Sequence, residues 1–359
     1  MAKMGVGILG ATGIVGQRYV SLLADHPWFE VRVVSASQAS VGKKYREAAK
    51  WFIEPPMPED IGELVVTPPD PQLFKREGVE LVFSALPSEV AKQVEEDFAA
   101  AGFAIASDAS AHRYDPDVPI LIPEVNPSHL QIIEYQRRNR GWSGFIVTGP
   151  NCTTIGLVMT LKPLLDAFGI KRVLVATMQA LSGAGYFGVP SMAILDNLIP
   201  YIKKEEEKVS SEPQKILGRF ENGKILPANV PIGASCHRVN VLDGHTEAVF
   251  VELGRKAFPE EVAKVFKEFQ PEPQQLKLPT APQPPIIVRE EPDRPQPRFD
   301  RYAGEPPRAK GMAVVVGRIR EEPVFETGIK YMLLSHNTIR GAAGNSVLTA
   351  ELLKAKGWL

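Results

Sequence analysis

The stretch GILGATGIVGQ, Gly7 to Gln17, decides the fold of the first half of this 359-residue chain. It joins an apolar run, typical of a buried strand, to a segment with helical periodicity. Its glycines Gly10, Gly13 and Gly16 recur at every third position between the two. Glycine lets the main chain approach a pyrophosphate closely, and a helix N-terminus offers it N–H groups and a positive dipole. Such glycines also occur in plain turns, but the strand–turn–helix context favours a dinucleotide site.

From this stretch to about residue 150, short β-rich runs alternate with helical patterns. Helices are expected over Ile14 to Ala24 and up to Ala101. This alternation favours a parallel sheet covered on both faces. We therefore expect an α/β fold whose residues 1–150 form a Rossmann-like dinucleotide-binding domain. The expected strands are VGIL, EVRVVSAS, VELVFSALP, FAIASDAS, VPILIPEV and FIVTGPNC, which begin at Val6, Glu30, Val79, Phe103, Val118 and Phe145.

The pattern changes after residue 150. A helix is expected from Thr153 to Phe168, with a kink at Pro163. Strands then dominate, and the helix Pro259 to Phe269 is one of few between them. This favours an α+β domain over residues 151–336 with a mixed or antiparallel sheet. The expected strands are RVLVATMQALSG, HTEAVFVEL, PIIVRE and GMAVVVGRI.

Two further segments carry expectations. The chain should end in a helix over Ile339 to Lys356, and residues 337–359 should pack back on the first domain. Residues 271–307 are dense in proline and could form a flexible linker. We expect an ordered excursion at a subunit interface instead, because the segment has apolar side chains to bury: Ile286, Ile287, Val288, Phe299 and Tyr302.

The composition excludes several classes of protein. With 41 basic and 42 acidic residues, the formal net charge is −1. That balance does not favour binding to nucleic acid or to an anionic membrane. Two cysteines cannot make a disulfide framework, and no His/Cys spacing predicts a metal site. We expect no signal peptide and no membrane span, and reduced thiols in the cytoplasm.

The end of the second strand bears on the choice of cofactor. An NAD site usually has a carboxylate there that binds the ribose hydroxyl. Here the strand ends in SASQAS, where Ser35 and Ser37 could donate hydrogen bonds to a 2′-phosphate. The sequence therefore favours NADP, with NAD as a secondary cofactor. The alternative is that the serines only cap a turn.

A rare thiol, Cys152, lies in TGPNCTTIG, where a strand gives way to a helix. The positive end of a helix should lower the pKa of the thiol and favour the nucleophilic thiolate. Asn151 could direct its amide at a developing oxyanion. The alternative is a small buried apolar residue, which we assign instead to Cys236. A proton acceptor is also needed. His245 is a candidate, and Arg238 could reach the same cleft.

These motifs together resemble aspartate-semialdehyde dehydrogenases, in particular their archaeal and fungal branch, over essentially the full length. The resemblance rests on GATGIVGQ, SALPSEVA, ASAHRYDPDVPILIPEVN, GPNCTT, QALSGAGY, EEEKVSSEPQKILG, SCHRVNVLDGH, LPTAP and HNTIRGAAG, in that order. Several motifs in one order are far more specific than any one of them.

The resemblance implies roles for individual residues. Cys152 would be the nucleophile that forms an acyl-thioester, and His245 the general acid/base. Arg238 would hold the substrate carboxylate. Glu205 would lie near its ammonium group, although the run of three glutamates leaves the register open and could be a solvated helix face. The other implied substrate-binding residues are Arg113, Lys208, Asn151 and Gln179, of which the first two would bind phosphate. The implied cofactor contacts are Gly10, Thr12, Gly13, Ile14, Val15, Ser35, Ser37, Ser84, Ala85, Leu86, Ser182, Gly183 and Asn337.

The implied activity is reversible, NADP-dependent reductive dephosphorylation of L-aspartyl 4-phosphate to L-aspartate 4-semialdehyde. It would serve lysine, threonine, methionine and diaminopimelate biosynthesis in a homodimer or homotetramer, with inorganic phosphate as a product. A malonyl-CoA or succinyl-CoA reductase of the same architecture is the nearest alternative. A non-catalytic NADP-binding regulatory protein is an alternative of another class. It would not need Cys152, His245 and Arg238 together.

Overall fold

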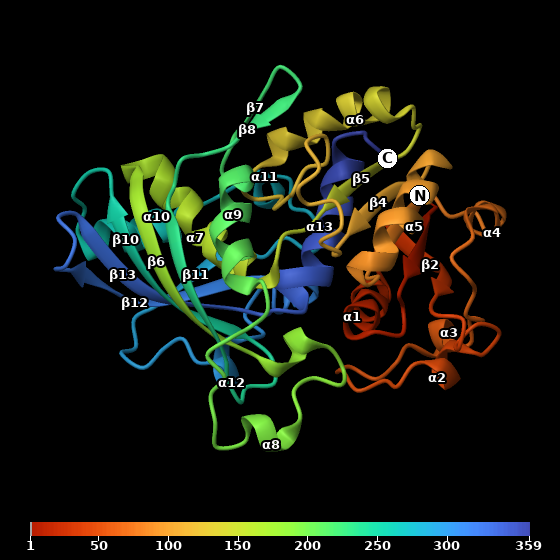
Figure 1. Ribbon diagram of the computed structural model, residues 1–359, viewed down its shortest axis with the longest axis horizontal. Coiled ribbons are helices and arrows are strands. Elements are labelled where there is room, and N and C mark those ends of the chain that lie inside the picture. Colours follow the sequence, from red (N-terminus) through yellow and green to blue (C-terminus); the bar gives the residue numbers. More distant parts are fainter. Residues whose placement is uncertain (1) are drawn as a thin grey trace.

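The computed structural model describes residues 2–359, which form two sheets placed side by side along the long axis of the molecule (Figure 1). The first sheet is wholly parallel, in the order β2-β1-β3-β4-β5. Its central strands are buried along their whole length, because helices cover both faces. The strands are β1 (Met4–Leu9), β2 (Phe29–Ser35), β3 (Leu81–Ser84), β4 (Ala104–Ser107) and β5 (Phe145–Thr148). The helices are α1 (Ile14–Leu23), α2 (Tyr45–Ala48), α3 (Glu59–Gly62), α4 (Pro71–Arg76), α5 (Ser88–Ala100) and α6 (Ile132–Arg140).

The second sheet is mixed, in the order β11-β12-β13-β10-β6-β9. Its four central strands are antiparallel, while β11 and β9 pair in parallel at the two edges. The strands are β6 (Ile170–Gln179), β9 (Ile232–Arg238), β10 (His245–Leu253), β11 (Ile286–Arg289), β12 (Val314–Glu322) and β13 (Gly328–Ser335). A small hairpin joins β7 (Arg219–Glu221) to β8 (Lys224–Leu226). Both parts of the predicted fold class are confirmed.

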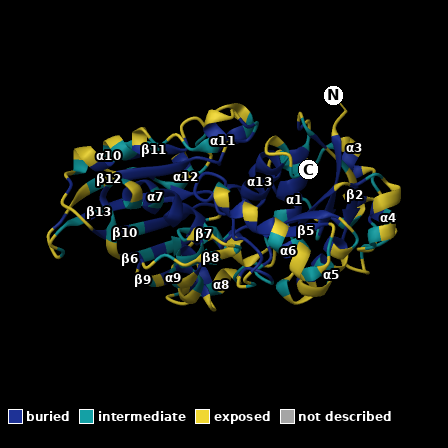
Figure 2. Ribbon diagram, turned by 90° about the horizontal axis from the view of Figure 1, so that it is seen from above, coloured by how far each residue is buried: buried dark blue, intermediate teal, exposed yellow. Residues whose placement is uncertain are grey.

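Helix α7 (Cys152–Phe168) links the two sheets and packs on the second. Its apolar side chains, among them Leu157 and Leu161, share one cluster with Val249 and Val251 of β10. In Figure 2 this helix is almost wholly buried. It runs without interruption through Pro163. The other helices of this half are α8 (Ser191–Ile194), α9 (Glu205–Ile216), α10 (Pro259–Lys267), α11 (Glu272–Gln275) and α12 (Pro297–Asp300).

The end of the chain returns to the first sheet. Helix α13 (Gly344–Ala355) contributes Val347 and Leu348 to the same core cluster as Val6 and Ile8 of β1. The expected single helix from Ile339 is wrong, because a π-helical turn precedes α13. Ala342 in that turn has non-helical backbone angles, φ −154° and ψ −106°. This break shapes the segment that lies against Cys152.

Two expectations about strands were wrong. VPILIPEV forms no strand and makes only an isolated bridge between Ile120 and Thr148. Its buried apolar side chains produced the strand pattern, but prolines interrupt the run. Strands β9 and β13 were not predicted. β9 is a half-exposed edge strand that ends at Arg238, and its weak alternation gave no clear signal.

The proline-rich segment is ordered, as expected, and contains α11, β11 and α12. Ile286 is buried at 1% exposure, whereas Phe299 is 63% and Tyr302 39% exposed within the single chain. Burial of these rings at a subunit interface stays a prediction. Within residues 2–359, no helix combines the length and apolar character needed to cross a membrane.

The glycine turn gives a test of the fold. Gly10 has φ +77°, and a Cβ atom there would lie 2.7 Å from the Ala85 carbonyl oxygen. Gly10→Ala should therefore lower the melting temperature by at least about 2–4 °C, the shift for roughly 1 kcal/mol in a large chain. Gly13→Ala is the control, because its Cβ would meet only the Gly10 oxygen, at 3.6 Å. Equal melting temperatures of the two cofactor-free variants would contradict this account.

Candidate active site

Cys152 is the first residue of α7, directly after the end of the parallel sheet at β5. Asn151 is the N-cap, and its side-chain oxygen accepts hydrogen bonds from the N–H groups of Thr153 (2.9 Å) and Thr154 (3.2 Å). This capping fixes the first turn of the helix. The thiol consequently lies at one defined point, partly exposed to a cleft between the two sheets.

His245 lies beside the thiol. Its Nε2 is 3.2 Å from the Cys152 Sγ, and its Nδ1 accepts a hydrogen bond of 3.1 Å from the Ala180 N–H. Because Nδ1 is an acceptor, the neutral ring carries its proton on Nε2, the nitrogen that faces the sulfur. Burial lowers the pKa of His245 to about 3, so the ring is neutral at physiological pH. The sequence placed both residues in one site, and the structure brings them into contact.

Two further predicted residues lie at the ends of neighbouring strands. Gln179 ends β6 and pairs in register with Arg238, which ends β9. The Arg238 Nη1 donates to the Ala180 carbonyl oxygen at 2.6 Å. A Cβ atom on Gly183 would lie 3.0 Å from that Nη1 and 3.6 Å from the His245 Nε2. Glycine at position 183 therefore lets the loop cover both side chains.

The structure settles the register of the three glutamates. Glu205 is buried, and its Oε1 accepts from the Asn151 Nδ2 and the Gln179 Nε2, each at 2.9 Å. Glu206 instead accepts from the Cys236 N–H, and Glu207 is exposed. Burial raises the pKa of Glu205, but the Asn151 hydrogen bond and the Lys208 charge outweigh it, so that the net pKa is lowered. A carboxylate anion thus lies within the site.

Arg113 and Lys208 both line the cleft. Arg113 is 5% exposed, and its guanidinium donates to the Gly149 and Asp108 carbonyl oxygens, each at 2.9 Å. Lys208 lies 3.5 Å from the Glu205 Oε2. The two cations come from different halves of the chain. Together they can bind an anion beside the thiol.

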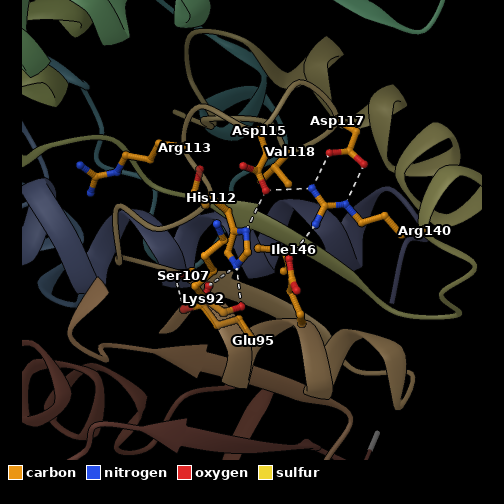
Figure 3. Close-up of polar contacts among 12 residues, drawn as sticks. Lys92, Glu95, Ser107, His112, Arg113, Asp115, Asp117, Val118, Arg140 and Ile146 are labelled. Atoms are coloured by element: carbon orange, nitrogen blue, oxygen red, sulfur yellow. Dashed lines mark hydrogen bonds and ion pairs between the residues drawn. The ribbon is translucent and has the colours of Figure 1, made fainter. Parts of the chain in front are cut away.

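A dense ionic cluster supports the loop that carries Arg113 (Figure 3). Arg140 donates to Glu96, Asp115 and Asp117, and the His112 Nδ1 lies 2.9 Å from Asp115. Three of these groups, on Glu96, His112 and Asp115, are close enough together to hold a metal ion. The Arg140 guanidinium already supplies the positive charge that the carboxylates need, so this cluster carries no metal assignment. Figure 3 shows Arg113 pointing away from it.

The expected lowering of the thiol pKa by the helix N-terminus is wrong for this site. Burial raises the pKa of Cys152 to about 12, and the Glu205 carboxylate raises it further, against the charges of Arg238, Lys208 and Arg113. The free thiol is therefore protonated at neutral pH. A bound cation that offsets the Glu205 charge, or a ligand that separates Glu205 from the sulfur, would favour the thiolate.

The cleft beside the thiol has a volume of about 370 Å³. The start of α1, where Gly13 is exposed as the N-cap, forms one wall. Free N–H groups of a helix N-terminus bind a pyrophosphate, and the absence of a side chain at Gly13 leaves space for it. The residues present therefore fit a dinucleotide. Of the predicted cofactor contacts, Gly13, Ile14, Val15, Ala85, Leu86, Ser182, Gly183 and Asn337 line the cleft.

The remaining predicted cofactor residues do not line this cleft. Gly10 and Thr12 lie in the turn behind it. Ser35 and Ser84 are buried at 1% and 0% exposure, whereas Ser37 is exposed at the end of β2. Of the two serines considered for a 2′-phosphate, only Ser37 therefore has a side chain that is open to solvent.

The sequence did not identify two residues that shape the site. A Cβ atom on Gly341 would lie 2.9 Å from the Cys152 Cβ, so only glycine lets this turn approach the thiol. Glu212 accepts hydrogen bonds from Arg113 and from the Asn151 N–H. Its position seven residues after Glu205, on the same helix face, was the available signal.

The raised thiol pKa makes a measurable prediction. Below the pKa of about 12, the thiolate fraction grows roughly tenfold per pH unit, so alkylation of Cys152 by iodoacetamide should accelerate from pH 7 to 10 without a plateau. Cys152→Ser supplies the background from the buried Cys236. A plateau near neutral pH would show that the helix N-terminus outweighs burial after all.

Comparison with known proteins adds to this geometry. Two family models match the chain: "Semialdehyde dehydrogenase, NAD binding domain" over residues 5–133 and "Semialdehyde dehydrogenase, dimerisation domain" over residues 161–340. An aspartate-semialdehyde dehydrogenase of Archaeoglobus fulgidus is 55% identical over 351 residues, covering 98% of each chain. A malonyl CoA reductase (NADP) of Metallosphaera sedula is 43% identical and covers 98% of this chain and 97% of its own.

A solved structure is similar over its full length. The crystal structure of aspartate semialdehyde dehydrogenase with NADP from Candida albicans has a TM-score of 0.89 and 40% sequence identity, with 100% of both chains covered. The same fold and a closely related sequence thus occur in a protein crystallised with this dinucleotide.

Proposed function

Because this chain belongs to the aspartate-semialdehyde dehydrogenase family, we propose that it interconverts L-aspartyl 4-phosphate and L-aspartate 4-semialdehyde through an acyl-thioester on Cys152. The family relationship makes it an oxidoreductase with a nicotinamide cofactor. The observation that carries the catalytic assignment is the 3.2 Å contact between the Cys152 Sγ and the His245 Nε2, at the edge of a dinucleotide cleft. A thiol paired with a histidine is an arrangement that supports covalent catalysis.

In the biosynthetic direction, the Cys152 thiolate attacks the acyl carbon of the acyl phosphate. The C–O bond to the phosphate breaks, and inorganic phosphate leaves with that electron pair and with the proton that the Cys152 thiol gives up. A nicotinamide cofactor held in the cleft would supply the hydride that reduces the thioester. The tetrahedral alkoxide then expels the thiolate and forms the aldehyde. Two small steps replace one difficult reduction.

His245 stabilises the negative charge that forms in these steps. Its Nε2 faces the sulfur, and the proton on that nitrogen can stabilise the thiolate and then the neighbouring alkoxide. The Ala180 N–H holds the ring in this orientation. We assign the role of proton donor to this nitrogen, because it carries the ring proton in this tautomer. The Asn151 Nδ2 donates one hydrogen bond to Glu205 and has a second N–H to offer to the oxyanion.

The charged residues of the cleft suit a substrate that carries three charged groups: a carboxylate, an ammonium group and a phosphate. Arg238 suits the α-carboxylate, because a guanidinium can bind it with two parallel hydrogen bonds. Glu205 suits the ammonium group. Arg113 and Lys208, which both line the cleft, suit the phosphate. A phosphorylated amino acid satisfies all of them.

We propose NADP as the main cofactor and NAD as a secondary one. The end of β2 has no carboxylate to repel a 2′-phosphate, and Ser37 is exposed there. The Candida albicans protein was crystallised with NADP, which supports the same choice. Lysine, threonine, methionine and diaminopimelate biosynthesis is the corresponding proposed role.

We also propose a homodimer or homotetramer that acts in the cytoplasm. The outer face of the mixed sheet is hollowed and apolar, and Leu174 (50%) and Val324 (83%) are exposed there. Apolar surface of this kind is typical of a subunit interface. Both cysteines are free thiols, as expected in a reducing compartment.

The function is tested by absorbance at 340 nm. The protein with NADP⁺ and L-aspartate semialdehyde should produce NADPH continuously only when inorganic phosphate is present, and Cys152→Ser should abolish turnover but retain NADPH binding. NADPH oxidation with malonyl-CoA or succinyl-CoA, without the phosphate-dependent reaction, would contradict the proposal. It would assign the protein the activity of its Metallosphaera sedula relative.

Arg238→Lys tests the carboxylate assignment. Lysine lacks the planar fork, so the KM for the aldehyde substrate should rise at least about tenfold, while the KM for NADP⁺ should stay within roughly threefold. Arg219→Lys is the matched control, because its side chain is 77% exposed. Unchanged kinetics in Arg238→Lys would assign this arginine a structural role through its bond to Ala180.

A further inference from the structure

Glu212 is a buried carboxylate between the thiol loop and the cation Arg113. It lies on α9 two turns after Glu205, so both carboxylates face the start of α7. The Glu212 side chain is 0% exposed. Burial of a carboxylate is costly unless it is paired and hydrogen-bonded, so its partners account for its presence.

Its two oxygens have different partners. The Glu212 Oε1 accepts from the Arg113 Nη1 at 3.0 Å, and the Oε2 accepts from the Asn151 N–H at 2.6 Å. One rigid group therefore fixes the distance between the guanidinium and the peptide that precedes Cys152. Only a carboxylate can accept from both donors at once in this orientation. An amide offers a single acceptor oxygen.

The same helix also anchors the main chain of the Arg113 loop. The Lys215 Nζ donates to the carbonyl oxygens of Arg113 (2.8 Å), Asp115 (2.7 Å) and Val118 (2.7 Å). The Gly149 and Asp108 carbonyl oxygens accept further guanidinium N–H groups. The N–H groups that remain are those available to a ligand in the cleft.

A carboxylate next to an anion-binding cation weakens the attraction of that cation for phosphate. The position of Glu212 therefore lowers the affinity of the site for phosphate. It favours a fixed orientation of Arg113, which matters because phosphate attack on a thioester requires a phosphate oxygen held within about 3–3.5 Å of the acyl carbon.

We propose that Glu212 is a positioning residue for the phosphate half of the reaction. Glu212 binds both the Arg113 guanidinium and the Asn151 N–H. It thereby fixes Arg113 in the orientation in which the arginine holds a phosphate oxygen in line with the acyl carbon on Cys152. This inference rests on the proposed function. Glu212 does not touch substrate in this assignment and acts through Arg113.

The test compares Glu212→Gln with Glu207→Gln, which makes the same charge change at an exposed position on the same helix. Both are assayed with NADP⁺, L-aspartate semialdehyde and varied phosphate. In Glu212→Gln the KM for phosphate should rise at least about tenfold, because displacement of a positioning group can cost up to about 10²-fold. The KM for the aldehyde and the single-turnover burst of NADPH without phosphate should stay within roughly threefold of wild type.

A double-mutant cycle with Arg113→Gln tests whether Glu212 acts through Arg113. In that background Glu212→Gln should change the phosphate KM by less than about threefold, because the two residues form one unit. Glu212→Asp, which keeps the charge but is too short to reach both donors, should show the same selective loss as Glu212→Gln.

Four outcomes would overturn the inference. The first is an unchanged KM for phosphate in both Glu212 variants, and the second is an equal rise in the KM for phosphate and for the aldehyde. The third is that Glu212→Gln raises the KM for phosphate by the same factor in the Arg113→Gln background as in the wild type. The fourth is a lower melting temperature without a selective change in the KM for phosphate, which would leave only a structural role. Failure of the wild-type protein to reduce NADP⁺ with phosphate would instead contradict the proposed function.

Discussion

The start of α7 is the constraint on which the rest of the site depends. Asn151 caps the helix with its side-chain oxygen, gives its amide to Glu205 and gives its backbone N–H to Glu212. These bonds hold both the side chain and the N–H of the residue that precedes the thiol. Cys152 has little freedom, and the groups that act on it must be brought to it by other elements. The glycines at positions 183 and 341 allow two loops to approach it closely.

The mixed sheet brings those groups together through its register. His245 begins β10 opposite Ser335, while Gln179 and Arg238 end β6 and β9 as a pair. Antiparallel and parallel pairing in one sheet thus place the start of one strand beside the ends of two others. His245, Gln179 and Arg238 therefore lie together at one end of these three strands, next to the start of α7. The apolar residues further along the same strands form the core that holds this end in place.

Charge in the site comes from one helix, one strand and one loop. Helix α9 supplies Glu205, Lys208 and Glu212, β9 supplies Arg238, and the loop after β4 supplies Arg113. Burial keeps the Cys152 thiol and the His245 ring neutral in the free protein. The Glu205 carboxylate raises the pKa of the thiol, and the three cations lower it. A bound ammonium group that offsets the Glu205 charge would therefore favour the thiolate.

The sequence alone determined the glycine turn, the two-part fold and the candidate nucleophile, because each follows from a pattern along the chain. A glycine turn between strand and helix and a capped thiol can each be recognised over fewer than twenty residues, and the alternation of elements can be recognised over residues 1–150. The resemblance to a known family then pointed to His245, Arg238, Arg113 and Lys208. The tertiary structure decided which of three adjacent glutamates faces the site, since helix register depends on packing. It also decided the contacts of Glu212 and Gly341, whose partners are far away in the chain. It reversed the expected shift of the thiol pKa, because burial is a property of the whole fold and not of the helix N-terminus.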